Sequence, residues 1–314
     1  MSESRTGVGK WSSTVQNWLQ TLASVATVGA LAFTAVQANA ALQQNVTAQQ
    51  QKTTETLGQA VEQLASEKIS VRILGVHALG RVFRESPDDR QAIVAGLSRF
   101  VQDRSAENPQ TTRYPWIGPE EDVQRAITVL SSSAGQELSA NIDLINVNMT
   151  GARLEKANLS HAQLIGTNLT YVRADSANLA GAYLMDAKLV TAEMPYSNLA
   201  GASLDHADLT GVQLSRANLN GARLFLANPS GATFDGARFV GANLAGANLS
   251  GSYLGGADLT RADLTGANLL GVTGLSQHQI DSACVNASTK LPPGLKAPRE
   301  MRAECVNGPG TVFS

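Results

Sequence analysis

Two segments, Ala157-Asn158-Leu159-Ser160-His161 and Ala217-Asn218-Leu219-Asn220-Gly221, show a five-residue pattern that runs from residue 142 to residue 273. Leu occupies the centre of most units, which lie at positions 144 to 269 in steps of five and number 26. Ala, Ser, Thr, Val or Ile stands two residues before every centre. The other centres are Met149, Ala174, Met194, Pro229, Phe234 and Phe239.

A period of five fits neither the 3.6-residue period of a helix nor the two-residue period of a strand. A helix would spread the Leu residues around its circumference, and a strand would send alternate ones to opposite faces. The period is explained if each unit forms one side of a square turn. The central residue and the small residue two before it would then both point inward. Such coils, stacked at the strand spacing of about 4.8 Å, would form a solenoid.

The run resembles the pentapeptide-repeat family, whose pattern is A(D/N)LXX. The resemblance implies a mainly β solenoid, a right-handed quadrilateral β-helix with four units per coil, over residues 141–273. Residues 20 apart would then stack in columns, and Asn residues before the centres would form amide ladders on two faces. Because Pro229 has no backbone N–H to donate to such a ladder, we expect a local bulge there.

One of the two more variable faces carries apolar residues that should point outward. The candidate partner surface consists of Ile145, Ile165, Tyr183, Met185, Phe225 and Leu226. Exposed apolar clusters of this kind usually mark contact surfaces. We consider a protein partner or a homodimer here, and the alternative is that the N-terminal domain or a loop covers the cluster.

The N-terminal part contains a polar segment, residues 1–18, followed by a predicted membrane-spanning or membrane-associated helix at residues 19–41. Its apolar portion, Leu19–Val36, is at the lower length limit for a span, and Trp11 and Trp18 precede it as interfacial aromatic residues do. One alternative is a secretory signal with a cleavage site at residues 38–40. Another is a helix buried within a protein bundle.

Residues 42–56 are predicted to be a linker or helical extension, and residues 57–131 an α-helical domain. Apolar stripes at helical spacing include Leu57, Val61 and Leu64, and then Val71, Leu74 and Leu79. This domain resembles the helical segment of membrane-associated bacterial pentapeptide-repeat proteins, and more weakly a HEAT-type hairpin. It would cap the open end of the first coil, which otherwise exposes unpaired strands.

Residues 274–314 are predicted to be a C-terminal cap and tail. Cys284 and Cys305 are the only cysteines in the chain. They would form a disulfide in an oxidising compartment, whereas two free thiols in the cytoplasm is the interpretation that we favour at this point.

The sequence shows no catalytic constellation, no metal-ligand spacing and no phosphate-binding loop, so we predict no enzyme activity and no cofactor. The formal net charge of −2 gives no reason to expect nucleic-acid binding. We therefore predict a non-catalytic scaffold that presents a rod to an unidentified protein partner.

The alternative function comes from the family, some of whose members protect DNA gyrase by imitating duplex DNA. Residues 137–275 hold 11 acidic and 8 basic residues, a balance too mixed for a convincing mimic of DNA.

The expected location is at a membrane through Leu19–Val36, with cytoplasmic coils. Periplasmic or secreted coils are the alternative if residues 1–40 form a signal peptide. Arg5 and Lys10 before the apolar segment, against Lys52 after it, mildly favour an N-terminus on the inside and coils on the outside.

Overall fold

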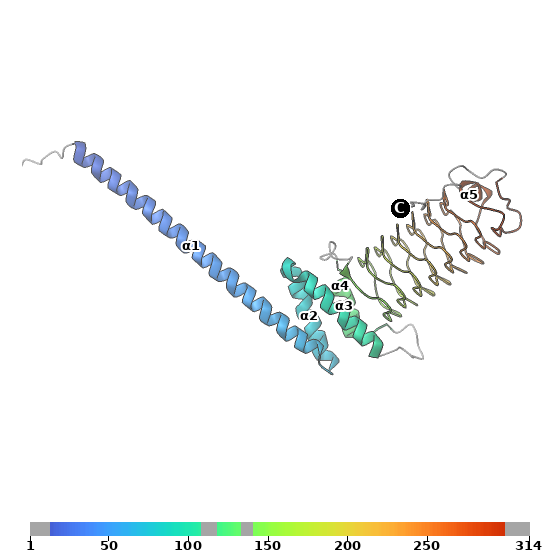
Figure 1. The fold of residues 1–314 in the computed structure, drawn as a ribbon, viewed down its shortest axis with the longest axis horizontal. Coiled ribbons are helices and arrows are strands. Elements are labelled where there is room, and N and C mark those ends of the chain that lie inside the picture. Colours follow the sequence, from blue (N-terminus) through green and yellow to red (C-terminus); the bar gives the residue numbers. More distant parts are fainter. Residues whose placement is uncertain (1–12, 108–117, 133–140, 299–314) are drawn as a thin grey trace, which may run out of the picture. The chain divides into compact units, whose positions relative to one another are not determined.

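The computed structural model (Figure 1) describes the backbone of residues 13–107, 118–132 and 141–298, and their side chains except those of residues 13–36, 42, 106 and 107. The chain divides into two compact units, Met1–Gly58 and Gln59–Ser314. The second unit contains a layer of helices followed by a β-helix.

Helix α1 (Ser13–Leu64) begins in the first unit and ends in the second. It includes the predicted membrane segment and shows that residues 42–56 are a helical extension. Over the described residues, none of the helices combines the length and the apolar character that crossing a membrane requires. The side chains of Leu19–Val36 lie outside the described residues, so the predicted span gains no support here and stays a prediction.

The helical layer consists of α2 (Ile69–Glu85), a short 3-10 helix η1 (Pro87–Asp89), α3 (Arg90–Glu107) and α4 (Glu121–Leu130). Their apolar faces meet in a small core. Its residues include Val76, Leu79, Phe83, Leu97, Val101 and Ile127.

Two residues of the predicted apolar stripes are exposed, since Val61 of α1 is 61% exposed and Leu74 of α2 is 57% exposed. The face of α1 that is buried contains Ala60 instead. A carbonyl–glycine contact explains this choice: a Cβ on Gly75 of α2 would lie 2.8 Å from the Ala60 carbonyl oxygen. Small residues therefore let these two helices approach closely.

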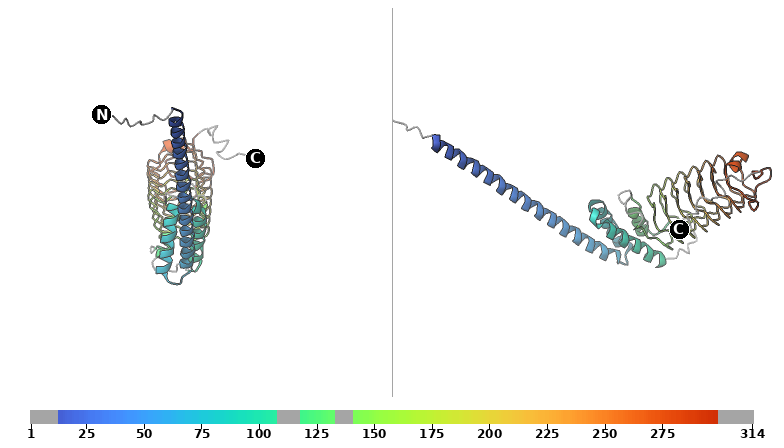
Figure 2. Two further views of the ribbon diagram at one scale, coloured as in Figure 1. Left: turned by 90° about the vertical axis from the view of Figure 1, so that its left-hand side faces the viewer. Right: turned by 45° about the horizontal axis from the view of Figure 1, so that its top comes forward.

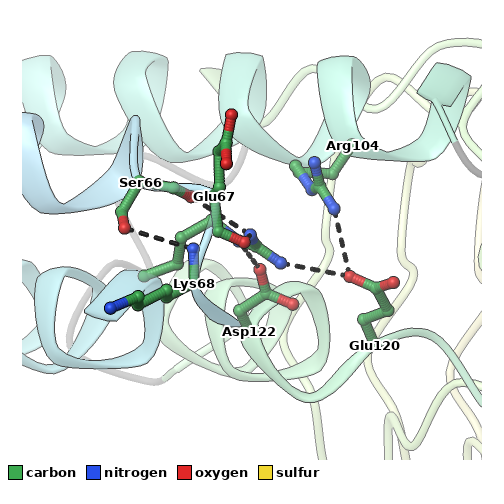
Figure 3. A network of polar contacts seen from close by, with 7 residues as sticks. Ser66, Glu67, Lys68, Arg104, Glu120 and Asp122 are labelled. Atoms are coloured by element: carbon green, nitrogen blue, oxygen red, sulfur yellow. Dashed lines mark hydrogen bonds and ion pairs between the residues drawn. The ribbon is translucent and has the colours of Figure 1, made fainter. Parts of the chain in front are cut away.

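A network of polar contacts (Figure 3) links the loop between α1 and α2, helix α2, helix α3 and the start of α4. Arg72 donates to the Asp122 carboxylate and to the carbonyl oxygens of Ser66 and Glu67, and it pairs with Glu120 at 3.2 Å. Arg104 of α3 reaches the same Glu120 oxygen at 3.2 Å. Since the Arg72 side chain is only 5% exposed and that of Asp122 is 0% exposed, solvent screens this pair very little.

The β-helix begins after residue 141 and has a coil period of 20 residues (Figure 2). Parallel bridges join residues 20 apart, for example Asn158 to Asn178 and Asn178 to Asn198. The N–H of Leu179 donates to the Asn198 carbonyl at 2.7 Å. Every central residue from 144 to 269 except Pro229 is among the buried hydrophobic residues. The prediction of a four-sided coil with an inward-facing Leu core is confirmed.

The polar residue before each centre has two roles, of which the sequence analysis anticipated one. Asn178 donates its amide to Asn158 at 2.8 Å and Asn198 to Asn178 at 3.0 Å, so the predicted ladder is confirmed. In addition, the Asn178 side-chain oxygen accepts from the backbone N–H of Ala180 at 3.3 Å. Asp263 binds the N–H of Thr265 in the same way. This local Asx turn explains why Asn and Asp both occupy the position.

Pro229 does not cause the predicted bulge. The register continues through it, because the N–H of Asn248 still donates to the Ala227 carbonyl at 2.9 Å and Gly231 to Ser250 at 2.9 Å. The missing proline N–H removes a single donor from the ladder. Phe234 and Phe239 pack edge to face in the following core positions, with ring centroids 5.1 Å apart.

Side chains from the helical layer complete the hydrogen bonds of the first coil. The Gln124 side chain in α4 donates to the Arg153 carbonyl and accepts from the Arg153 N–H, both at 2.9 Å. From α3, Gln102 donates to the Asp143 carbonyl at 3.1 Å, and Ser98 accepts from its N–H at 3.4 Å. These groups take the place of the backbone that a preceding coil would supply.

The C-terminal end closes with helix α5 (Gln277–Ser282), which begins with a capping box at Ser276. After α5 the chain forms a further partial coil, in which Cys284 makes a parallel β-bridge to Asp263 and Lys290 makes one to Asn268. Cys284 is disulfide-bonded, so the interpretation of two free thiols is wrong. Cys305, the other cysteine of the sequence, lies outside the described residues.

Candidate interaction face

One side of the rod, the apolar face, consists of seven units that stack in one column. Their centres are Leu144, Leu164, Leu184, Leu204, Leu224, Leu244 and Leu264. The structure brings all six residues of the predicted partner surface to this side. The position directly after the centre holds Ile145 in the first coil, Ile165 in the second, Met185 in the third and Phe225 in the fifth. Neighbouring coils are about 4.8 Å apart, so these side chains form a strip along the rod.

The exposure of the six residues differs. Tyr183 is 43% exposed, Phe225 41% and Leu226 49%, whereas Ile145, Ile165 and Met185 are half-buried. Tyr183 precedes the Leu184 centre, and Leu226 occupies the corner after Phe225. Among the described residues, the helical layer does not bury the strip, which leaves apolar side-chain surface open to solvent.

Sequence reasoning missed an internal ion pair within the strip. Asp205 takes the strip position of the fourth coil, and its side chain is only 6% exposed. It accepts from Arg223 Nε at 3.0 Å and from the Phe225 N–H at 3.1 Å. His206 packs edge to face on the Phe225 ring, with centroids 5.9 Å apart. The sequence signal for this ion pair was the spacing of 18 residues between Asp205 and Arg223. In a coil of 20 residues, that spacing places the two side chains on neighbouring coils of the same face.

The corner residue Leu226 leans over the next coil. A Cβ built on Gly246 would lie 2.7 Å from Leu226 Cδ2, so a larger residue at 246 would push the Leu226 side chain aside. On the apolar face, the fifth coil therefore carries Phe225 and Leu226 next to the small residues Ala245 and Gly246 of the sixth coil.

The corners of the coils adopt positive φ, which strains any residue other than glycine. Eleven of the seventeen corners between 146 and 226 nevertheless carry a side chain, against one of nine between 231 and 271. The eleven are Asn146, Lys156, His161, Tyr171, Ser176, Asp186, Thr191, Tyr196, His206, Arg216 and Leu226. The cost of these side chains is concentrated in the first four coils and the start of the fifth, where the apolar strip also lies.

The opposite side of the rod carries paired charges. Arg173 lies 3.5 Å from Glu155 and 4.0 Å from Glu193, and Arg153 lies 3.8 Å from Glu121. These contacts agree with the interpretation of the Arg153, Arg173 and Glu193 column as surface ion pairs, which contribute little free energy. A shallow cavity of about 310 Å³ lies beside them, lined by Gly151 and the start of α4.

The described part of the chain contains no group of three or more His, Cys, Asp or Glu residues placed to hold a metal ion. The pKa of Asp258 is lowered by hydrogen bonds from the hydroxyl and the backbone N–H of Thr260 and by nearby Arg238. That carboxylate is a repeat residue in its Asx turn, and its lowered pKa follows from that turn.

Comparison with known families finds eight copies of the pentapeptide-repeat model, at residues 140–170, 196–224, 213–251 and 242–273. A search of curated proteins finds no match.

Among solved structures, HetL, a pentapeptide repeat protein involved in heterocyst differentiation regulation in the cyanobacterium Nostoc sp. strain PCC 7120, is 32% identical. The likeness covers 47% of this chain and 70% of HetL, with a TM-score of 0.43. A pentapeptide repeat protein of the Arabidopsis thaliana thylakoid lumen is 30% identical over 38% of this chain and 73% of that protein, with a TM-score of 0.18.

QnrB1, a plasmid-mediated fluoroquinolone resistance protein, is 19% identical over 46% of this chain and 76% of that chain, with a TM-score of 0.32. At that identity the likeness concerns the fold alone. The matched repeats, the 20-residue coil register and the Asn ladders together show that this chain belongs to the pentapeptide-repeat family, whose members are generally non-catalytic, and that it carries an additional N-terminal helical region.

Proposed function

We propose that this protein is a non-catalytic interaction scaffold that presents the first five coils of its rod to a protein partner. The observation that carries the proposal is the distribution of corner side chains. Each left-handed corner costs on the order of 1–2 kcal/mol for a residue with a Cβ, and glycine serves at nearly all corners beyond residue 231. Side chains kept at such a cost are expected where they contact something.

The apolar face is the contact surface that we propose. It combines Tyr183, Phe225 and Leu226, each more than 40% exposed, with the half-buried Ile and Met residues of the strip. Aromatic residues and Met are enriched at protein interfaces, and aromatic side chains bury a large area at a low cost in side-chain entropy. The opposite side exposes Tyr196 at 56% and Tyr253 at 41% as well, but charged Arg and Glu side chains share that side.

A membrane tether through Leu19–Val36 is the second part of the proposal, and it rests on the uncharged sequence between Trp11 and Gln51. We place the coils on the oxidising side of that membrane. Cys284 is disulfide-bonded, which removes the free thiols that had favoured the cytoplasm, and disulfides persist in oxidising compartments. Arg5 and Lys10 ahead of the apolar segment favour the same orientation.

We rank the gyrase alternative below this function because the rod lacks a continuous acidic surface. Asp205 is neutralised by Arg223, and Glu193 and Glu155 both approach Arg173. A mimic of duplex DNA would need unpaired negative charge along its length.

The test is a cross-linking experiment in intact cells that express the full chain. Tyr183 and, as a control on the opposite side, Tyr253 are each replaced by a photo-reactive benzoylphenylalanine. The two tyrosines are similarly exposed, at 43% and 41%. We expect a protein adduct from position 183 only, in the membrane fraction. A chain that stays in the soluble fraction would contradict the tether, and the absence of any adduct from position 183 would contradict the interaction face.

A further inference from the structure

We propose that the partner of the apolar face is the same face of a second copy of this chain, in an antiparallel arrangement centred on the third coil. The inference rests on the proposed function, because it names the occupant of the face described above. In a two-fold symmetric pair the same surface patch serves both copies. A two-fold axis that lies in the contact plane and crosses the rods brings their coils together in reverse order.

Under that symmetry the two ends and the centre of the strip meet apolar side chains, whereas Ile165 comes opposite Asp205 of the second copy, whose carboxylate is largely buried and paired with Arg223. The first coil meets the fifth, so Ile145 packs against Phe225 of the second copy. The third coil meets itself, so Tyr183 and Met185 each lie beside their own symmetry mates. Offset stacking of two tyrosines adds to the area that they bury.

The charges also match. Asp143 in the first coil is exposed and forms no ion pair among the described residues. Arg223 in the fifth coil is 63% exposed, and its guanidinium is held in place by Asp205. The antiparallel arrangement sets Asp143 of each copy opposite Arg223 of the other. Two opposite-charge pairs at the ends of the strip would fix its register.

Polar residues meet polar residues between those ends. Gln163 in the second coil comes opposite Ser203 in the fourth, so an amide faces a hydroxyl group. A like-charge pair forms between Asp186 and its own mate, but this residue lies at an exposed corner on the rim, where solvent and salt screen like charges.

The coils beyond the fifth would lie opposite the helical layer of the second copy. Helix α3 lies at the level just before the first coil, since its Gln102 and Ser98 contact Asp143. The residues that would face this helix are small. They are Ala245 and Gly246 in the sixth coil and Thr265 and Gly266 in the seventh. After the centres, the apolar face therefore carries only small residues in the two coils that would face the helical layer of the second copy.

The size of the contact predicts a weak dimer. Five coils span roughly 20 Å along the rod, which places the buried area at or below the lower end for stable complexes, about 1,200 Å² in total. We expect association in the micromolar concentration range, corresponding to about −8 kcal/mol. Tethering two chains in one membrane would raise their effective concentration.

Cysteine cross-linking of the full chain in mild detergent tests both the pairing and its register. Tyr183→Cys, Gln163→Cys, Ser203→Cys and the opposite-side control Tyr253→Cys are prepared separately, without reductant, so that the native disulfide stays intact. A short bismaleimide should link Tyr183→Cys to itself and leave Tyr253→Cys monomeric. Gln163→Cys and Ser203→Cys should each link poorly alone and efficiently when the two proteins are mixed.

A sedimentation measurement with Ile165→Asp supports the cross-linking. We expect this variant to weaken dimerisation about tenfold or more, while its melting temperature confirms that the rod is folded. Equal cross-linking of Tyr183→Cys and Tyr253→Cys would overturn the dimer, and so would efficient self-linking of Gln163→Cys. An adduct between position 183 and a different protein in cells would preserve the proposed function and reject the second copy as its occupant.

Discussion

Each position of the five-residue unit has its own physical task. The centre and the residue two before it fill the core, as Leu179 and Ala177 do at 1% exposure. An Asn before the centre, such as Asn178, closes an Asx turn and adds a rung to a ladder. The residue two after the centre adopts positive φ, as at Thr191, where φ is 51°. Only this last position requires a backbone conformation that residues with a Cβ disfavour. A side chain kept there is therefore the clearest sign of a functional requirement.

A glycine exchange between two corners tests this strain. Thr191 and Gly231 occupy equivalent corners two coils apart, and a Cβ on Gly231 would meet nothing within 4 Å. Gly231→Thr should lower the free energy of unfolding by about 1–2 kcal/mol through backbone strain alone. Thr191→Gly should be neutral or slightly stabilising, because relief of strain offsets the entropy cost of glycine, about 0.5–1 kcal/mol.

Urea denaturation of both variants gives the comparison. A loss of more than about 1 kcal/mol for Thr191→Gly, the cost of glycine at an ordinary position, would show that its corner is not strained.

The five-residue repeat was enough to predict the register, the buried Leu columns and the Asn ladders, because each follows from one short period. The local Asx turn was missed, although Asn and Asp alternate at one position. The pairing of Asp205 with Arg223 was also missed, because it depends on side-chain conformations 18 residues apart. The expected bulge at Pro229 was wrong because a coil held by several ladder bonds tolerates the loss of one donor.

Between elements, the most informative contact is the one that closes the solenoid. Gln124 of α4 offers Arg153 one donor and one acceptor, as a β-strand neighbour would. A side-chain amide has the same hydrogen-bonding groups as a peptide unit, so a helix can end a β ladder without leaving its backbone unpaired. This contact joins the helical layer to the first coil as one folded body.

Replacement of Gln124 tests the closure. Gln124→Ala would leave the Arg153 N–H and carbonyl without their partners, and we expect a loss of about 1–3 kcal/mol in the free energy of unfolding. Gln213→Ala is the matched control, since Gln213 is exposed and its side chain has no hydrogen bond in the described part of the chain. Hydrogen exchange should also show faster opening of the first coil in Gln124→Ala. Similar stability and exchange in the two variants would contradict this role for Gln124.

Arg72 gives a second test at the element scale. Arg72→Met would leave the buried Asp122 carboxylate without its counter-ion, and removal of one member of a buried pair typically costs about 3–5 kcal/mol. Arg99→Met breaks an exposed pair with Asp103 and should cost about 0.5 kcal/mol or less. Thermal unfolding of the two variants measures the stability that each substitution removes. Equal losses would mean that the network in Figure 3 contributes no more than a surface contact.

The helical layer was harder to predict than the coils because its burial does not follow apolar periodicity. A stripe through Val61 and Leu74 places these residues in the core, yet both are exposed. The buried positions are Gly75 and the charged Arg72, which a hydrophobic pattern assigns to the surface. Close helix approach and a buried ion pair are tertiary effects, and the printed sequence shows neither at a fixed spacing.

For the whole molecule, the two ends of the solenoid differ in the side chains at their corners. Coils in such folds contact only their neighbours, so one end can carry strained, exposed side chains while the other supplies stability. Here the side chains gather near the helical layer, and glycine corners and α5 occupy the far end. The proposed interaction region therefore lies in the coils next to the helical layer.

The disulfide at the far end makes the side of the membrane measurable. Cys284 is buried at 4% exposure and bonded, within the partial coil that pairs with Asp263. If the coils face an oxidising compartment, cells lysed in the presence of a maleimide reagent should yield a chain that carries no label. Reduction and denaturation before labelling should then add two labels, one for each cysteine in the sequence. Cys284→Ser should lower the free energy of unfolding by roughly 2–4 kcal/mol. Two labels without reduction would place the coils in the cytoplasm, because thiols there are kept reduced.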